Sequence, residues 1–279
     1  MRRHSGEWRS QGVNWPVMAH HQKNDGQRIV SLAPSVTSIL VALGARRELA
    51  GVSKWCNDVA QVGHLPQLGD CWKLDVEEVM RLRPTILIGS VPFAAAAVTQ
   101  ILGEPVAFLA LNPRTLADIE VNIRTLARLV NRPGTGEKLI ARMRKEFQRI
   151  GERGKAFARR RPRVYCEAWP NPRISSPPWV AELVALAGGE FATRPGQRVS
   201  EEDVARAEPD LIVLAWTATG DRADPSQALL NRAWRDIPAV KSQRVVVIRD
   251  ELLNTPGPPL MQGARELLRA IRSVADKKR

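Results

Sequence analysis

The sequence predicts an α/β protein with two Rossmann-like lobes, each built on a parallel-rich sheet, joined by long connector helices, with a ligand cleft between the lobes. Apolar runs alternate with helical patterns over residues 28–112 and again over 162–279, as in parallel sheets flanked by helices. Residues 113–161 carry helical patterns with no strand between them. The segment Asp75–Ser90 also aligns without gaps on Ser200–Ala215, which indicates that the two α/β regions are similar units.

Length and composition fit a globular chain of this kind. The 279 residues, 44% hydrophobic and 25% charged, are enough to bury the cores of two lobes. No apolar run reaches the roughly 18 residues of a membrane span. Residues 1–27 are polar and contain no apolar stretch of the signal-peptide kind, so we expect a disordered leader or a misassigned start site.

In the N-terminal lobe, residues 28–112, a strand from Arg28 to Ala33 leads through a proline turn into a helix that ends at Gly44. Ser35 is expected to cap this helix, because a serine hydroxyl can accept from a free N–H group of the first turn. Further strands are expected at 50–55, 85–89 and 105–111, with helices from Asp75 and over 93–102.

The connector, residues 113–161, contains two helical patterns separated by a break at NRPGTG. The second pattern carries much of the net charge of +13, with eleven of the 42 basic residues between Lys138 and Arg163. Apolar residues recur within it at three- and four-residue spacing. This pattern favours an amphipathic helix with a solvated basic face, so we do not expect nucleic-acid binding.

The C-terminal lobe, residues 162–279, repeats the alternation of strands and helices. The strand RVYCEA opens it, and a stiff, aromatic loop leads to a helix that is expected to begin at Ser176–Pro178. A capped helix from Ser200 precedes the apolar strand DLIVLA, RVVVIRD is another strand, and Leu260–Val274 is a terminal helix.

The two repeated segments place the expected cleft. Asp75 with Glu78, and Ser200 with Asp203, have the spacing of a helix N-cap and the third helical residue, and a buried strand follows each helix. Two such lobes face each other at the carboxyl ends of their strands, where open α/β sheets bind ligands.

Four tryptophans fall at or near these strand ends, outside the helical patterns: Trp55, Trp72, Trp169 and Trp216. An indole offers a large apolar surface and one N–H donor, which suits a large, partly flat ligand. The alternative for any single one of them is that it fills the rim of its lobe.

Motifs of catalysis and metal binding do not occur in the sequence. It contains no GxSxG, P-loop, HExxH or GxGxxG pattern, and Cys56, Cys71 and Cys166 are too far apart for a metal knuckle or a CxxC pair. His64 is the one histidine beyond the leader, and a single loop histidine is usually just exposed. We therefore predict no catalytic residue, no metal site, and free thiols that are buried or half-buried.

The run RIVSLAPSVTSILVALGA, followed by LAGVSKW, LPQLGD, DVEEVMRLRPTILI, the connector and a second lobe, resembles the substrate-binding proteins of ABC importers with a rigid helical backbone. The resemblance covers about Arg28 to Val274 in order, and within that superfamily the chain is most similar to cobalamin-binding members. It implies capture of a corrinoid, cobalamin or a relative. Siderophore and haem binders share the first-lobe signature, so a siderophore, haem or another metal chelate is the alternative ligand.

The resemblance also implies delivery to an ABC-type permease by docking of one acidic residue on each lobe, Glu77 and Glu202. The alternative role of both is that of a helix-start carboxylate, stabilised by the helix dipole by about 0.3–1 kcal/mol. On the matching cleft loops, the implied ligand contacts are Ser35, Trp55, Trp72, Trp169, Asn171, Pro172, Trp216, Leu252 and Asn254.

A receptor of this kind is expected to be a monomer without enzymatic activity, with cobalamin or another corrinoid as its bound ligand and no catalytic cofactor. The family resemblance implies a periplasmic location, whereas a chain without a readable signal peptide is cytoplasmic as encoded. A cytosolic chain with this fold would instead be a corrinoid carrier, sensor or scavenger. A tetrapyrrole-handling enzyme or chaperone on the same scaffold is a further alternative.

Overall fold

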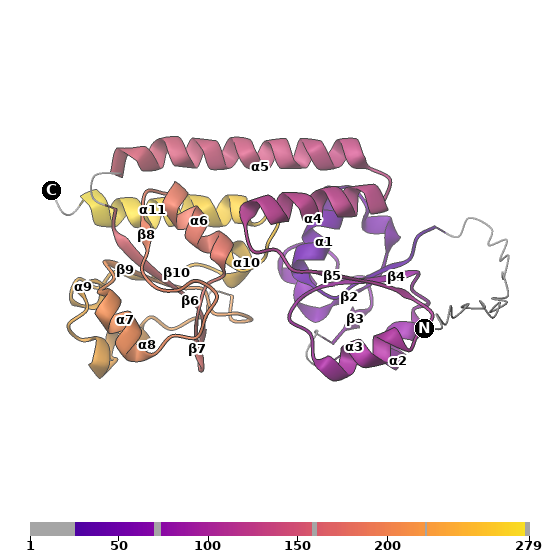
Figure 1. Ribbon diagram of the computed structural model, residues 1–279, viewed down its shortest axis with the longest axis horizontal. Coiled ribbons are helices and arrows are strands. Elements are labelled where there is room, and N and C mark those ends of the chain that lie inside the picture. The colour runs from indigo at the N-terminus through magenta and orange to yellow at the C-terminus, as the bar shows by residue number, and fades with distance from the viewer. Residues whose placement is uncertain (1–25, 70–73, 158–160, 221, 277–279) are drawn as a thin grey trace, which may run out of the picture.

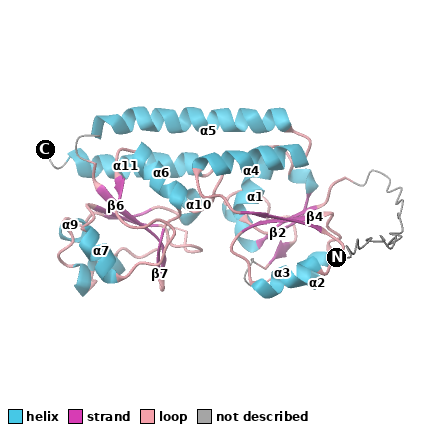
Figure 2. Ribbon diagram, in the orientation of Figure 1, coloured by secondary structure: helices cyan, strands magenta, loops and turns pink. Residues whose placement is uncertain are grey.

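The computed structural model describes residues 26–69, 74–157, 161–220 and 222–276, and it shows two α/β lobes side by side along a layer of long helices (Figures 1 and 2). This arrangement confirms the predicted two-lobed α/β fold class. Within those ranges, no helix combines the length and the apolar character needed to cross a bilayer.

The N-terminal lobe contains a five-stranded parallel sheet in the order β3-β2-β1-β4-β5. All three residues of β1 are buried, because an inner strand of a parallel sheet is covered on both faces. The strands are β1 (Ile29–Ser31), β2 (Leu49–Ser53), β3 (Gln67–Leu68), β4 (Ile86–Ser90) and β5 (Ala107–Leu111), and the helices are α1 (Pro34–Ala42), α2 (Val76–Arg81) and α3 (Ala95–Leu102).

The start of α1 corrects the sequence prediction for Ser35. The N-cap residue is Ala33, no side chain caps the helix, and Ser35 lies inside the first turn. Proline at the first helical position explains the difference, because its fixed φ angle begins the helix one residue before the serine.

The connector consists of two consecutive helices, as predicted: α4 (Leu116–Leu129) and α5 (Pro133–Gly154). Thr115 and Asp118 form a capping box at the start of α4, and Asn131 adopts a φ of 54° at the break. The apolar stripe of α5 is buried, so the predicted amphipathic helix is confirmed. Helix α5 packs on α4 and also on α6 and α11 of the other lobe.

The C-terminal lobe has a sheet in the order β10-β9-β6-β7, with β8 also beside β6. Its strands are β6 (Arg163–Pro170), β7 (Arg173–Ser175), β8 (Glu190–Phe191), β9 (Leu211–Leu214) and β10 (Val245–Val247). Its helices are α6 (Pro178–Leu186), α7 (Glu201–Ala207), α8 (Ser226–Leu229), α9 (Pro238–Lys241), α10 (Asp250–Leu253) and α11 (Leu260–Asp276).

Two features of this lobe differ from the sequence prediction. The stretch after RVYCEA is a hairpin, since Trp169 and Pro170 continue β6 and β7 returns antiparallel to it. Helix α6 begins at Pro178 with Pro177 as its N-cap, so Ser176 does not cap it. The Ser176 side chain is buried instead.

One apolar core runs through both lobes by way of α4 and α5, and a smaller core fills the outer layer of each lobe. Close helix contacts hold the C-terminal lobe to the connector. A Cβ atom on Gly154 of α5 would overlap the carbonyl oxygen of Leu186 at the end of α6. The backbones of α5 and α6 therefore meet directly at this glycine.

The repeated segments fold alike. Asp75 accepts a hydrogen bond from the Glu78 N–H at 3.1 Å, and Ser200 and Asp203 form a reciprocal capping box. Arg83 and Glu208, at matching positions before a proline, both adopt left-handed φ angles of 48° and 42°. The gapless alignment therefore corresponds to one repeated helix–strand unit.

Candidate functional site

In the N-terminal lobe, Ser31 at the end of β1, Thr37 of α1 and Cys56 after β2 form a buried, neutral polar cluster. The Thr37 hydroxyl donates to Ser31 Oγ at 2.7 Å and lies 3.0 Å from Cys56 Sγ. Burial raises the pKa of the Cys56 thiol, which therefore stays protonated. Ser35 lies beside this cluster in the chain and is buried.

Trp55, next to Cys56 in the chain, is a partly accessible aromatic residue. It lies in the 3₁₀ turn Lys54–Asp58 directly after β2 and is half-buried. The Lys54 ammonium group is 4.8 Å from the centre of its ring. The Lys54 ammonium group thus covers part of one ring face, and the residue as a whole stays partly exposed at the carboxyl end of β2. Trp72 lies outside the described residues.

In the C-terminal lobe, the β6–β7 hairpin presents a second open indole. Trp169 is 40% exposed, and its Nε1–H donates to the Asn171 carbonyl oxygen at 2.7 Å. Asn171 and Pro172 form the exposed turn of the hairpin. The hydrogen bond fixes the ring along the turn while its apolar surface stays accessible.

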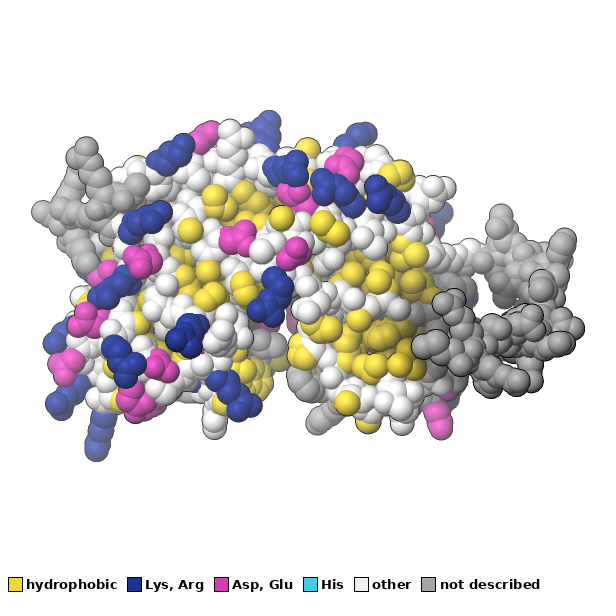
Figure 3. All heavy atoms as spheres, in the orientation of Figure 1, with side chains coloured by type: hydrophobic (Ala, Val, Ile, Leu, Met, Phe, Trp, Pro, Cys, Tyr) yellow, Lys and Arg dark blue, Asp and Glu magenta, His cyan; other side chains and the backbone are white. Residues whose placement is uncertain are grey.

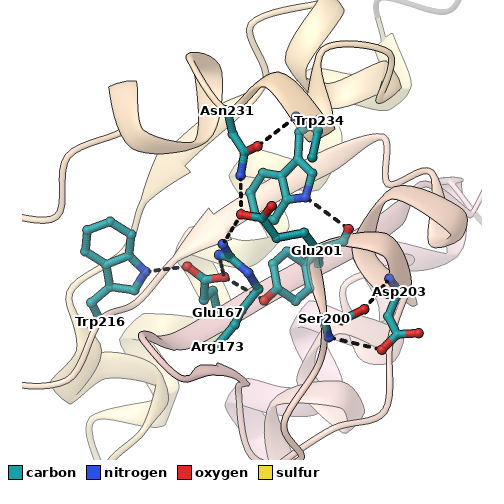
Figure 4. A network of polar contacts seen from close by, with 10 residues as sticks. Glu167, Arg173, Ser200, Glu201, Asp203, Trp216, Asn231 and Trp234 are labelled. Atoms are coloured by element: carbon teal, nitrogen blue, oxygen red, sulfur yellow. Dashed lines mark hydrogen bonds and ion pairs between the residues drawn. The ribbon is translucent and has the colours of Figure 1, made fainter.

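Beneath this hairpin lies a buried ionic network (Figure 4). Glu167 of β6 is fully buried and accepts from Tyr165 Oη at 2.7 Å, Arg173 at 2.6 Å and Trp216 Nε1 at 2.9 Å. Burial and the adjacent Glu167 carboxylate raise the pKa of the Tyr165 hydroxyl, which stays protonated. Arg173 also pairs with Glu201 at 3.2 Å.

The predicted contact Trp216 is therefore only 6% exposed, with its N–H group already engaged by Glu167. It packs in the outer core of the lobe. Sequence reasoning missed Glu167 and Arg173. Two signals in the sequence could have found them. Glu167 is a carboxylate within an apolar strand, and Arg173 directly follows the proline-rich turn after that strand.

The loop after β9 is held by α10 and the residue that follows it. Asp250 accepts from the N–H groups of Ala218 at 3.2 Å and Gly220 at 3.3 Å, and burial raises its pKa to about 6. Asn254 donates to the Ala215 carbonyl oxygen at 2.7 Å. Leu252, another predicted contact, lies within the apolar core.

Charged side chains on strand-end loops of the two lobes are close enough to influence one another. Burial and the Glu251 carboxylate of the C-terminal lobe raise the pKa of Asp58 in the N-terminal lobe, against the opposing charges of Arg249 and Arg222. Figure 3 shows the surface indented between the lobes on the side away from α5. Trp55 lies directly after the carboxyl end of β2, and Trp169 is the next-to-last residue of β6.

The two candidate docking acids lie on matching helices. Glu77 is the second residue of α2 and its side chain is 90% exposed; Glu202 is the second residue of α7 and is also exposed. Hydrogen bonds from its own N–H group and from the Ser200 hydroxyl lower the pKa of Glu202. Helices α2 and α7 lie on the side of the molecule opposite α5 (Figure 1).

The titratable side chains of the described residues do not form a metal-binding cluster. The residues with described positions contain no group of three or more histidine, cysteine, aspartate or glutamate side chains that could hold an ion. His64 is exposed, Cys56 and Cys166 are buried free thiols, and Cys71 is not among the described residues.

Comparisons with known proteins agree with this architecture. The chain is 26% identical over 261 residues to an uncharacterised ABC transporter substrate-binding lipoprotein, YvrC, of Bacillus subtilis, covering 89% of this chain and 81% of that one. It is 24% identical over 251 residues to a vitamin B12-binding protein of Pectobacterium atrosepticum, covering 86% and 87%. The structure of a periplasmic haem-binding protein from Pseudomonas aeruginosa matches with a TM-score of 0.78 and 26% identity, covering 88% and 92%.

Residues 29–252 match a family model described as "periplasmic binding protein". That match includes both sheets and both connector helices, and it ends within α10. Members of this family are solute carriers rather than enzymes, and they work with ABC transporter permeases. The chain therefore belongs to the periplasmic binding protein family, as a substrate-binding protein of the ABC importer type.

Proposed function

We propose that this protein captures a corrinoid, with cobalamin as the first candidate, between its two lobes. The observation that carries the proposal is the pair of partly accessible indoles, Trp55 and Trp169, each at the carboxyl end of a strand in its own lobe. A corrin is large, with apolar edges, and flat indole faces bind such a surface with little loss of conformational entropy. The similarity to vitamin B12-binding proteins supports the same ligand class.

The remaining proposed contacts have supporting positions. Asn171 and Pro172 extend the exposed surface of the Trp169 turn. The other proposed contacts are buried or half-buried: Ser35, Trp216, Leu252 and Asn254. Trp72 completes the proposed set.

Haem is the second candidate ligand. The similarity to the haem-binding protein of Pseudomonas aeruginosa supports it, because that structure matches the same two-lobed fold over 88% of the chain. A planar tetrapyrrole and a corrin both suit an indole-lined cleft, so the distinction needs a direct measurement.

A tryptophan-fluorescence titration with cyanocobalamin, dicyanocobinamide and haemin tests the ligand. We expect saturable quenching by both corrinoids and a weaker response to haemin. Trp55→Ala and Trp169→Ala should each weaken corrinoid binding by roughly tenfold to a hundredfold, as for a central aromatic contact. Leu102→Ala, at an exposed apolar residue of α3, is the matched control and should leave affinity unchanged. Quenching by haemin alone would reject the corrinoid in favour of haem.

We further propose that the loaded monomer delivers its ligand outside the inner membrane by docking Glu77 and Glu202 onto an ABC permease. Both carboxylates are exposed on matching helices of the two lobes, so one molecule can present one charge to each permease subunit. The double variant Glu77→Lys/Glu202→Lys should lose binding to the reconstituted permease and keep its ligand affinity. The control Glu104→Lys/Glu190→Lys reverses one exposed charge on each lobe elsewhere and should bind the permease normally. Loss of ligand affinity in the first variant would contradict the docking role.

A further inference from the structure

Glu167 stands out as a fully buried carboxylate that the apolar core does not require. Burying an ion pair costs desolvation energy, and an apolar pair of similar volume is often as stable or more so. Stability alone therefore does not explain why this ion pair is buried, and we infer that it has another role. The positions of the three hydrogen-bond donors to Glu167 indicate what that role is.

Two of the donors come from the segments that form the C-terminal wall of the proposed ligand site. Arg173 is the first residue of β7, directly after the Trp169–Pro172 turn. Trp216 lies in the loop after β9. Figure 4 shows both side chains converging on the one carboxylate. Glu167 thus joins two loops that are separate in the sequence.

Backbone hydrogen bonds tie the same two segments together at their bases. The Ala215 N–H donates to the Glu167 carbonyl oxygen, and the Thr217 N–H donates to the Ala168 carbonyl oxygen, both at 2.9 Å. These backbone bonds continue the sheet. The hydrogen bonds to the Glu167 side chain act beyond the end of the sheet, where they connect the β6–β7 hairpin to the loop after β9.

Arg173 is itself held from three sides. One nitrogen reaches Glu167 at 2.6 Å, another reaches Glu201 at 3.2 Å, and the guanidinium carbon lies 4.4 Å from the centre of the Trp234 ring. The planar fork of arginine can serve two carboxylates and an aromatic face at once, which a lysine ammonium group cannot do. Its side chain is only 16% exposed, so it has one available arrangement.

We propose that Glu167 and Arg173 are positioning residues that hold the Trp169–Pro172 turn and the loop after β9 in the arrangement that receives the ligand. This inference depends on the proposed function in one respect, the place where the ligand binds. The two residues act by pre-organisation, since a wall fixed before binding loses less entropy when the ligand arrives.

Amide hydrogen exchange tests the positioning without any ligand. Glu167→Gln should speed exchange at residues 168–173 and 215–220 by about tenfold or more, with α4 and α5 unchanged. The matched control is Arg163→Gln, which breaks the exposed Arg163–Glu208 pair of 3.0 Å at the opposite end of β6 and should leave both loops within about twofold of wild type. Wild-type exchange rates in Glu167→Gln would overturn the proposal.

A second variant separates positioning from overall stability. Glu167→Gln leaves Arg173 with one carboxylate partner fewer, whereas Glu167→Gln/Arg173→Gln removes both charges and should recover most of the lost thermal stability. The two loops should still exchange fast in the double variant, and Arg173→Lys should resemble it. Recovery of slow loop exchange together with stability would overturn the positioning role.

The third experiment measures the affinity of each variant for two ligands, cyanocobalamin and haemin. If the wild type binds either probe, Glu167→Gln should weaken that binding by about tenfold to a hundredfold, the usual effect of losing hydrogen bonds to a charged group. Unchanged affinity would overturn the inference. If the wild type binds neither probe, the ligand assignment fails, and the exchange experiment alone decides the positioning role.

Discussion

The two lobes share one helix–strand unit, yet the strand ends of their sheets are stabilised by different chemistry. In the N-terminal lobe, the buried polar groups are the neutral hydroxyl and thiol groups of Ser31, Thr37 and Cys56. In the C-terminal lobe, they include the fully buried Glu167 carboxylate, which pairs with the largely buried Arg173.

Neutral hydrogen bonds and ionic ones respond differently to their surroundings. Hydroxyl groups do not titrate in the physiological range, so the N-terminal strand ends are held by packing and by hydrogen bonds between neutral groups. The C-terminal strand ends are held by an ion pair, so removing one partner leaves the other charge buried and unpaired. The arrangement at the C-terminal strand ends therefore depends on single side chains more than that at the N-terminal strand ends.

The largest expected effect concerns how the C-terminal lobe joins the connector. Gly154→Ala places a Cβ against the Leu186 carbonyl group, so α5 and α6 must separate, and we expect a loss of about 3 kcal/mol or more in the free energy of unfolding. Gly134→Ala, on the same helix beside the N-terminal lobe, meets no atom within 4 Å and should gain about 0.5–1 kcal/mol. Urea unfolding measures both, and equal losses would show that the two ends of α5 are packed alike.

The second effect is a pH dependence that belongs to the C-terminal lobe. The pKa of Asp250 is about 6 in the folded protein against an ordinary value of 3.8, so between these values the folded state binds more protons than the unfolded state. The free energy of unfolding should therefore fall as pH rises from about 4 to about 6, by at most about 3 kcal/mol from this group. Asp58, whose pKa is also raised, contributes in the same direction.

Asp250→Asn should flatten this slope, as measured by thermal unfolding at a series of pH values. The control Asp224→Asn removes an exposed carboxylate whose pKa is lowered by the Ser226 hydroxyl and N–H groups, and it should not flatten the slope. A slope that survives in Asp250→Asn would assign the pH dependence to other groups.

The smallest effect compares the repeated units themselves. Arg83→Gly and Glu208→Gly relieve the left-handed backbone at matching positions, and each should raise the free energy of unfolding by about 0.5–1 kcal/mol. The gain at Glu208 should be the smaller one, because its exposed ion pair with Arg163 is lost. A larger gain at Glu208 would show that the pair adds no stability.

Local signals in the sequence were sufficient to predict most of the fold. Strand and helix alternation, the proline break before α5 and the caps Asp75 and Ser200 depend on residues close together in the chain, so the sequence predicts them well. The Ser35 cap was wrong because Pro34 starts α1 earlier.

The site was harder to predict, because its side chains meet across long stretches of chain. Glu167 and Trp216 are 49 residues apart, and no periodic pattern connects them. The burial of Trp216 follows from that contact, so the sequence could show its place at a strand end but not its exposure. The hairpin at β7 was missed because a proline-rich stretch is typical of a loop, whereas here it forms only the turn.

Helix α5 has a consequence for the kinetics of capture. It spans 22 residues, about 33 Å at the usual rise, with no break along its length. It packs on α6 and α11 of the C-terminal lobe and on α4, which in turn packs on α1 of the N-terminal lobe. A cleft whose walls share one continuous helix has no separate closing step to add after encounter. Ligand association should then follow a single exponential whose observed rate increases linearly with ligand concentration, without the plateau that a slow closure would impose.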